Sequence, residues 1–212
     1  MTLNTLSQSL TTGDQDMVRK LVNQALEEKI EPSVILNNGL IAGMDDVGEK
    51  FQKGEMFIPH MLLAARAMHA ALDILKPRLV ESGAKPKGKV LLGTVKADHH
   101  DIGKNLVAMM LEGKGFEVVD IGVDAPPEKF VQSVAEDIQI VGMSSLLSTT
   151  APFLGETIEA LDKAGLRSRI RIMVGGGVVT QTMADSLGAD GFGQDAAVAA
   201  DVALKLIQAG NA

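Results

Sequence analysis

Apolar residues recur at helical spacing through the first part of the chain. Between residues 14 and 29 they return every three or four positions, which places them on one face of a helix. The same pattern follows Pro32, a residue suited to the first turn of a helix, and it begins again near Pro59 after a break at Gly54. With a short leading helix over residues 3–10, the pattern predicts an all-α four-helix bundle with short connecting turns.

The second part of the chain has the pattern of an α/β domain. Short β-branched runs, separated by segments of helical length, occur at residues 90–95, 116–121, 138–143 and 170–174. Near-continuous apolar strands that alternate with helices indicate a parallel sheet covered on both faces. A weaker fifth run lies at residues 190–193, before a closing helix that carries Val202 and Ile207. The pattern predicts a flavodoxin-like fold with a five-stranded parallel sheet, whose ligands bind beyond the carboxyl ends of the strands.

A short segment rich in glycine, proline and lysine separates the two parts. Residues 82–88 read Ser-Gly-Ala-Lys-Pro-Lys-Gly, which is the composition of a linker between compact units. We therefore expect a helical bundle over residues 1–83 and a flavodoxin-like domain over residues 88–212, with the linker as the natural hinge between them.

Composition narrows the classes of function. With 46% hydrophobic and 22% charged residues, the chain is ordinary for a soluble protein. No apolar run reaches the roughly 18 to 20 residues of a membrane span, and the N-terminus lacks the features of a signal peptide, so we expect a cytoplasmic protein that does not bind membranes. The absence of cysteine excludes disulfides, zinc ribbons, iron–sulfur clusters and a thiol nucleophile. A net charge of −7, without Trp or Tyr, argues against nucleic acid as a partner.

The loop after the first predicted strand holds two of the four histidines. A histidine suits the role of a neutral nitrogen ligand, and Asp98, two residues before His100, can accept the second ring N–H and raise the basicity of the ligand. Gly103 lets the backbone pass close to a bulky group. The alternative is that Asp98 or Asp101 caps the helix that starts near Ile102, while the histidines are merely solvated.

Three loops taken together resemble the signature of cobalamin-binding domains of the methionine synthase type. They are Asp98-x-His100-x-x-Gly103, Ser145-x-Leu147 and Gly175-Gly176. Forty-one residues separate Gly103 from Ser145, and twenty-seven separate Leu147 from Gly175, as the pattern of that family requires. The helical part, with its turn at residues 55–60, resembles the cap of methyl carriers. At this length, the chain resembles the small corrinoid proteins of methyltransferase systems.

The resemblance implies a role for the first motif. Cobalamin, as methylcobalamin or Co(I) cobalamin, would bind with its lower base displaced and with His100 as the axial ligand. Asp98 would be the hydrogen-bond partner of His100, which takes up a proton when it leaves cobalt. In methionine synthase a serine extends this relay, but the corresponding position here is Ala151, so the proton must pass through water or another hydroxyl. The motif spacing points to His100 rather than to His99.

The resemblance also implies where the rest of the cofactor binds. The Ser145 hydroxyl would face a base nitrogen, Leu147 would pack beside the ring, and Gly175-Gly-Gly177 would offer bare backbone to the nucleotide tail. The glycine run taken alone also fits a flexible turn. Further cofactor contacts are expected at Asp101, Ile102, Gly103 and Thr149.

Two residues at the start of the last predicted helix are candidates for the upper face of the cofactor. Phe57 and Met61 lie four positions apart, so they share a helical face and could cover the corrin ring, although a role in the core is the alternative. Such a cap would shield the cofactor and swing aside when a methyltransferase docks.

The resemblance implies two protein partners and an activator. A substrate-specific methyltransferase would load the methyl group, and an acceptor methyltransferase would pass it to tetrahydrofolate or to a thiol coenzyme. A reductive activator would restore oxidised cofactor. The donor stays open among methylamines, methanol, glycine betaine and methoxylated aromatics.

Three other classes compete with a methyl carrier. Subunits of adenosylcobalamin mutases carry the same motif, but they normally lack a helical cap. Cobalamin-dependent sensors pair a bundle with this domain, but they usually add a DNA-binding module, which is not visible here. Two-metal phosphoesterases use an Asp-His-His motif, but their chemistry requires further carboxylates and histidines, where this chain offers Ser145 and Gly175.

Overall fold

The computed structural model describes residues 2–81 and 86–210 of the chain. The chain divides into a helical unit, Met1–Pro86 with Glu112–Gly115, and an α/β unit, Lys87–Leu111 with Phe116–Ala212. Of the predicted linker over residues 82–88, residues 82–85 lie outside the described residues. None of the helices in the described ranges is long and apolar enough to cross a membrane.

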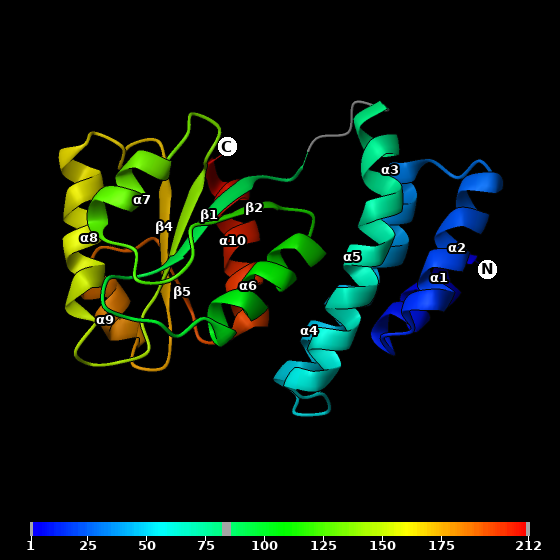
Figure 1. Ribbon diagram of the computed structural model, residues 1–212, viewed down its shortest axis with the longest axis horizontal. Coiled ribbons are helices and arrows are strands. Elements are labelled where there is room, and N and C mark those ends of the chain that lie inside the picture. The colour runs from blue at the N-terminus through cyan, green and yellow to red at the C-terminus, as the bar shows by residue number, and fades with distance from the viewer. Residues whose placement is uncertain (1, 82–85, 211–212) are drawn as a thin grey trace. The chain divides into compact units, whose positions relative to one another are not determined.

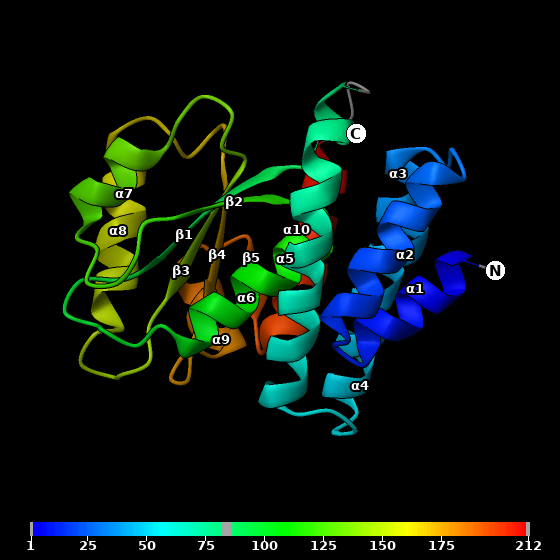
Figure 2. The ribbon, with the colours of Figure 1, turned by 45° about the vertical axis from the view of Figure 1, so that its right-hand side comes forward.

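The helical unit contains the predicted helices in the predicted order. They are α1 (Thr2–Thr11), α2 (Gln15–Glu27), α3 (Pro32–Ile35), the π-helix η1 (Leu36–Ile41), α4 (Ala42–Gln52) and α5 (Ile58–Glu81). Because α3, η1 and α4 follow one another without a break, the described part of this unit forms four helical rods. Their arrangement can be followed in Figures 1 and 2. Their fully buried apolar side chains include Leu6, Val22, Leu40, Met44 and Met68.

Local sequence explains the sharp turn between α1 and α2. Gly13 has φ +74°, a conformation that side chains disfavour, and a Cβ atom there would lie 2.5 Å from the Leu63 Cβ atom. Asp14 caps α2, because its carboxylate accepts the Met17 N–H at 3.0 Å. The chain can therefore reverse direction and bring the apolar faces of the two helices together.

The α/β unit contains a five-stranded sheet in which every pair of neighbours is parallel. The strands are β1 (Lys89–Thr94), β2 (Glu117–Asp120), β3 (Ile140–Ser144), β4 (Arg171–Gly175) and β5 (Gly191–Gly193). The strand order β2-β1-β3-β4-β5 confirms the predicted flavodoxin-like fold, including the weak fifth strand.

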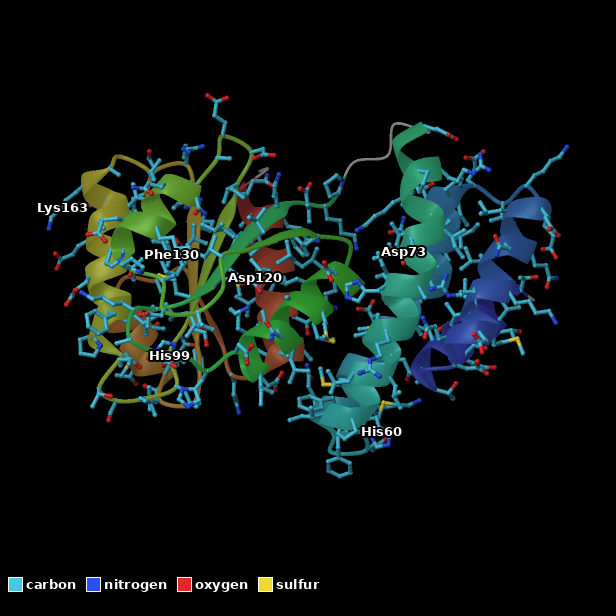
Figure 3. All side chains as sticks on the ribbon, in the orientation of Figure 1. His60, Asp73, His99, Asp120, Phe130 and Lys163 are labelled. Carbon is cyan, nitrogen blue, oxygen red and sulfur yellow. The ribbon has the colours of Figure 1, made fainter. Side chains whose placement is uncertain are left out.

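Helices cover both faces of this sheet (Figure 1). They are α6 (Ile102–Gly113), α7 (Pro127–Ser133), α8 (Pro152–Lys163), α9 (Gln181–Ser186) and α10 (Ala196–Gly210). The face under α7, α8 and α9 is a packed apolar core, in which Phe130 of α7 is fully buried against the sheet (Figure 3). Since side chains alternate along a strand, the opposite face under α6 and α10 displays a different set of residues, and this is the face that contains the cavity described below.

Candidate functional site

The predicted motifs meet at the carboxyl edge of the sheet. The ends of β1, β3 and β4 are in register, because Thr94 pairs with Ser144 and Ser144 pairs with Gly175. The loop after β1 carries His99 and His100, the loop after β3 carries the serine motif, and the glycine run follows β4. Parallel strands thus bring three segments that are distant in sequence to one edge.

The histidine loop presents one imidazole with a fixed orientation. The Nδ1 atom of His100 lies 2.7 Å from Oδ1 of Asp98, and the same oxygen accepts the backbone N–H of His100 at 3.0 Å. A carboxylate can only accept, so Nδ1 carries the proton and Nε2 keeps its lone pair. The His100 side chain is 51% exposed and Asp98 is fully buried. The arrangement therefore offers a single ring nitrogen to a ligand.

The other carboxylate oxygen of Asp98 also accepts two hydrogen bonds. Its Oδ2 atom accepts the Leu146 backbone N–H and the Thr150 hydroxyl, each at 2.8 Å. Burial alone would raise the pKa of Asp98, but the hydrogen bonds from Leu146, His100 and Thr150 outweigh burial and hold this pKa well below its usual range. Asp98 therefore stays ionised and accepts the hydrogen bond from Nδ1 of His100.

Two buried hydroxyls continue the chain of hydrogen bonds beyond Asp98. The hydroxyl oxygens of Ser145 and Thr150 lie 2.8 Å apart, and both side chains are buried. Because the Thr150 hydrogen is directed at Asp98, Ser145 is the donor in this pair. In methionine synthase a serine at the position of Ala151 extends the proton relay. Here the hydroxyl that contacts Asp98 comes from Thr150, one position earlier.

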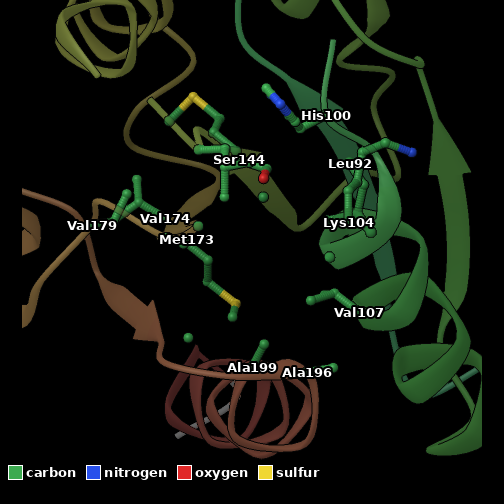
Figure 4. A pocket seen from close by; sticks show the side chains of 18 of the residues that line it. Leu92, His100, Lys104, Val107, Ser144, Met173, Val174, Val179, Ala196 and Ala199 are labelled. Carbon is green, nitrogen blue, oxygen red and sulfur yellow. The ribbon is translucent and has the colours of Figure 1, made fainter. Parts of the chain in front are cut away.

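A cavity of about 620 Å³ opens beside His100 (Figure 4). It lies between the sheet and the helices α6 and α10. Its walls include Leu92, Gly142 and Met173 from the strands, Val107 and Leu111 from α6, and Ala196 and Ala199 from α10. The cavity is therefore a deep, mainly apolar slot, with His100 at its mouth.

The prediction that Ser145 faces the bound group stays a prediction, and the structure places the neighbouring serine on the cavity wall. Ser144, the last residue of β3, lines the cavity, and its hydroxyl has no protein partner among the described residues. Ser145 is fully buried and bonded to Thr150. The physical reason is the alternation of side chains along the chain, which directs adjacent residues to opposite sides.

The leucines that follow the two serines show the same difference of one position between the predicted residue and the residue that lines the cavity. Leu146 lines the cavity and is 40% exposed, whereas Leu147 and Thr149 are exposed and do not line it. The prediction that Leu147 and Thr149 contact the bound group is therefore not supported by the geometry. In contrast, Asp101, Ile102 and Gly103 line the mouth beside His100, as predicted from the first motif.

The glycine run lines the cavity and leaves its backbone bare. Gly175, Gly176 and Gly177 all contribute to the wall. Gly176 has φ +118°, and a Cβ atom there would lie 2.0 Å from the backbone oxygen of Ser145. Only glycine fits at this position, because any side chain would displace the serine loop that supports Asp98.

The two residues predicted to cover the upper face differ in exposure. Phe57, just before α5, is 61% exposed, and its backbone N–H donates to Nδ1 of His60 at 3.0 Å. Met61 is 2% exposed and belongs to the core. Met61 thus has the buried position of the core alternative, and the prediction that the two side chains cover a cofactor stays a prediction.

Asp124 holds the histidine loop in place, although the sequence motifs did not indicate it. Its Oδ1 atom accepts the Ala97 N–H at 2.7 Å, and its own N–H donates to the backbone oxygen of Asp98 at 2.9 Å. Ala97 and Asp124 have φ values of 61° and 49°, which is strained backbone for residues other than glycine. These two hydrogen bonds fix the backbone that leads into Asp98 and His100.

The donor set fits a metal that is already held by a macrocycle. Among the described residues, no three His, Cys, Asp or Glu side chains are grouped so that they could hold a metal ion. One imidazole beside a deep apolar slot suits an axial ligand for a large cofactor with a tail. The same observation argues against two-metal hydrolysis, which needs several protein ligands for each ion.

The fold and the site together define a class: flavodoxin-like proteins with one oriented histidine at the mouth of a deep, mainly apolar slot. Two models of the B12 binding domain match this chain, one over residues 88–203 and the other over residues 2–76. The chain belongs to the corrinoid proteins, and its cofactor is cobalamin.

Relatives cover nearly the whole chain. The dimethylamine corrinoid protein 1 of Methanosarcina acetivorans is 41% identical over 97% of both chains. A cobalamin-binding protein from Desulfitobacterium hafniense has a TM-score of 0.81 and 33% identity, over 96% of this chain and 98% of that one. The methanol:cobalamin methyltransferase complex of Methanosarcina barkeri gives a TM-score of 0.83 and 29% identity, and the match covers 96% of this chain and 78% of that one. These findings confirm that the chain is a corrinoid protein of the methyl-carrier class.

Replacing Asp124 should loosen the histidine loop. We expect Asp124→Ala to weaken cobalamin binding by about tenfold, because the residues that orient a metal ligand typically contribute tenfold to a hundredfold to affinity. Asp124→Asn is the matched control, since it keeps an acceptor oxygen and tolerates the left-handed conformation. Titration of the cofactor-free protein with hydroxocobalamin checks both variants. Equal loss in the two variants would show that the carboxylate oxygen does not position the loop.

Proposed function

We propose that the protein binds cobalamin in the base-off/His-on form, with His100 on cobalt, and carries a methyl group between two methyltransferases. The observation that carries this proposal is the His100 imidazole, which is fixed through Nδ1 by buried Asp98 and exposes Nε2 at the mouth of the slot. Bound cobalamin supplies a cobalt centre that accepts and releases a methyl group. His100, Asp101, Ile102, Gly103 and the glycines 175–177 form the proposed binding surface, and buried Asp98 supports His100 from behind it.

The slot supports displacement of the lower base. A base that leaves cobalt needs a site of its own, and the cavity beside His100 is deep and mainly apolar. The free hydroxyl of Ser144 can donate to a ring nitrogen of that base, which is the role expected of Ser145 from the sequence. Gly175 and Gly176 admit the tail against bare backbone.

The residues around His100 are arranged to manage one proton. His100 would hold the metal through Nε2, and when Nε2 is not engaged as a ligand it could take up a proton, which would make the ring positively charged. Ionised Asp98, 2.7 Å from Nδ1, stabilises that charge. Thr150 and the Leu146 N–H stabilise the carboxylate in turn. The His100 imidazole can therefore act either as a neutral ligand or as a cation, because the negative charge of Asp98 is already in place beside it.

Thr150 should be essential to this network although it touches no cofactor. Thr150→Val keeps the volume of the side chain, but it leaves Asp98 one donor short and leaves the buried Ser145 hydroxyl only the Leu147 carbonyl oxygen, at 3.4 Å, as acceptor. We expect the free energy of unfolding of the α/β unit to fall by about 2 kcal/mol. Thr150→Ser, which keeps the hydroxyl, should lose less than about 1 kcal/mol. Urea denaturation of the cofactor-free protein measures both values, and equal losses would argue against the hydroxyl chain.

Methylated amines are the first donors to test. The relative from Methanosarcina acetivorans is named for dimethylamine, and it matches this chain over almost its full length. The acceptor methyltransferase would use tetrahydrofolate or a thiol coenzyme, and a reductive activator would rescue oxidised cofactor. The test is incubation of the reduced, cobalamin-loaded protein with dimethylamine and a dimethylamine methyltransferase. Isotope-labelled methyl on the extracted cofactor supports the carrier role, and its absence with every donor class named above would refute it.

A further inference from the structure

Strand register defines successive levels of the slot. Thr94, Ser144 and Gly175 pair at the level of the mouth. Two residues further down each strand, Leu92, Gly142 and Met173 pair on the same face, and below them lies Val90 of β1. The levels therefore run from a hydroxyl at the mouth to thioether and alkyl side chains in the interior.

Gly142 makes room for a ligand at the deeper level. A Cβ atom at this position would lie 2.4 Å from Cδ2 of Leu92, so only glycine leaves both the leucine and the open space in place. Beside it, the side chain of Met173 extends into the space between Val107 of α6 and Ala199 of α10 (Figure 4). Met173 is thus the flexible side chain that forms the inner wall.

Among the described residues, the polar groups in the inner part of the slot are bonded within the protein, and the exposed side chain of Gln194 follows β5 at the carboxyl edge of the sheet. Among the described residues that line the cavity, the ammonium of Lys104 is buried and bound to Asp120, and Asp195 caps α10 by accepting the Val198 N–H at 2.8 Å. The strand backbone at this level is paired within the sheet. Polar lining residues with unoccupied groups, such as Ser144, lie at the mouth.

We propose that this slot selects corrinoids whose displaced lower base is an apolar benzimidazole over those that carry adenine, and that Met173 determines the selectivity. The inference rests on the proposed function, because only a displaced base enters the slot. Adenine carries an exocyclic amine and additional ring nitrogens, and an apolar wall leaves these groups without partners. Each buried polar group without a partner lowers affinity by roughly tenfold or more. Ser144 does not discriminate, since both bases have a ring nitrogen that can accept.

The experiment compares two corrinoids on three forms of the protein. Cobalamin and its adenine analogue are titrated into the wild type, Met173→Gln and Met173→Leu, and the affinities are measured from absorption spectra. The selectivity is the affinity for cobalamin divided by the affinity for the analogue. Dividing the wild-type selectivity by that of a variant cancels the different cost of detaching each base in free solution.

We expect Met173→Gln to shift the selectivity toward adenine by about tenfold, because the amide can pair with the exocyclic amine and ring nitrogens. Met173→Leu should leave the selectivity within about twofold, since the wall stays apolar. Ala199→Ser on α10 places a hydroxyl on the opposite wall and should shift the selectivity in the same direction, which keeps the test valid if Met173→Gln does not fold.

Failure of the inference is distinct from failure of the proposed function. Suppose that both corrinoids bind in the His-on form, but that no folded polar variant, Met173→Gln or Ala199→Ser, changes the selectivity. The slot then does not discriminate between the bases, and the inference is wrong. If wild type binds neither corrinoid in the His-on form, the proposed function itself fails. Binding of base-free cobinamide as tightly as cobalamin, with no effect of Met173→Gln on cobalamin, would also overturn the inference.

Discussion

Replacing His100 with alanine is expected to weaken cobalamin binding by about a hundredfold or more and to abolish the His-on absorption spectrum. The side chain supplies the exposed ring nitrogen at the mouth of the slot, and its orientation depends on buried Asp98. Loss of a metal–ligand bond exceeds the tenfold to hundredfold effect of losing a residue that merely orients a ligand. Titration of the cofactor-free variant with hydroxocobalamin gives both the affinity and the spectrum.

His99 provides the matched control for this experiment. It also lines the mouth of the cavity, and its imidazole has no hydrogen-bond partner among the described residues. Without a carboxylate to fix its ring, His99 is not oriented as a ligand, so His99→Ala should change the affinity by no more than about threefold. A His-on spectrum that persists in His100→Ala but disappears in His99→Ala would exchange the two assignments.

Asp98→Asn is expected to have the second-largest effect, and to act on both binding and folding. An amide nitrogen at either carboxylate position would face hydrogen-bond donors from His100 or from Leu146 and Thr150. We expect a loss of about 2 kcal/mol or more in unfolding free energy and a loss of tenfold to about a hundredfold in cobalamin affinity. Urea denaturation and hydroxocobalamin titration measure the two effects. Asp162→Asn, an exposed change of the same charge on α8, controls for net charge.

The pH dependence of the Asp98 contribution has a definite sign. The pKa of Asp98 is depressed in the folded protein, so its stabilising contribution is fully present above the ordinary aspartate pKa of about 4. The contribution is lost as the pH falls below that value. The difference in unfolding free energy between wild type and Asp98→Asn should therefore shrink as the pH falls below about 4. A difference that stays the same below about pH 4 would contradict ionised Asp98.

Regular elements were predictable because their physics is local. Helical spacing in the first part and β-branched runs in the second identified the four helical rods and the five strands. The six-residue π-helix η1 was not predicted, since it interrupts one long rod without changing the apolar stripe. The position of His100 followed from motif spacing, and the geometry around Asp98 supports that assignment.

At the end of β3, motif spacing and side-chain direction point to different serines. The spacing from Gly103 selects Ser145, whereas Ser144 is the one of the two that lines the cavity. Counting strand alternation from buried Val141 and Met143 would have assigned Ser144 to the opposite face, where the slot lies.

Other parts of the site depend on tertiary contacts that no local pattern reveals. Asp124 reaches the histidine loop from the segment after β2, across 27 positions of sequence. Thr150 reaches Asp98 across 52 positions. Met61 has the same helical spacing from Phe57 whether it faces a cofactor or a core, and only packing distinguishes the two cases.

The most direct measurement is electron paramagnetic resonance of the Co(II) form of the cobalamin-loaded protein, produced with histidine labelled by nitrogen-15 in the imidazole ring. If His100 is the axial ligand, the hyperfine triplet from ordinary nitrogen is expected to become a doublet in the labelled protein, and His100→Ala should lose that signal. A triplet that persists in the fully labelled protein would show that the cofactor keeps its own base on cobalt, and would contradict His100 as the ligand.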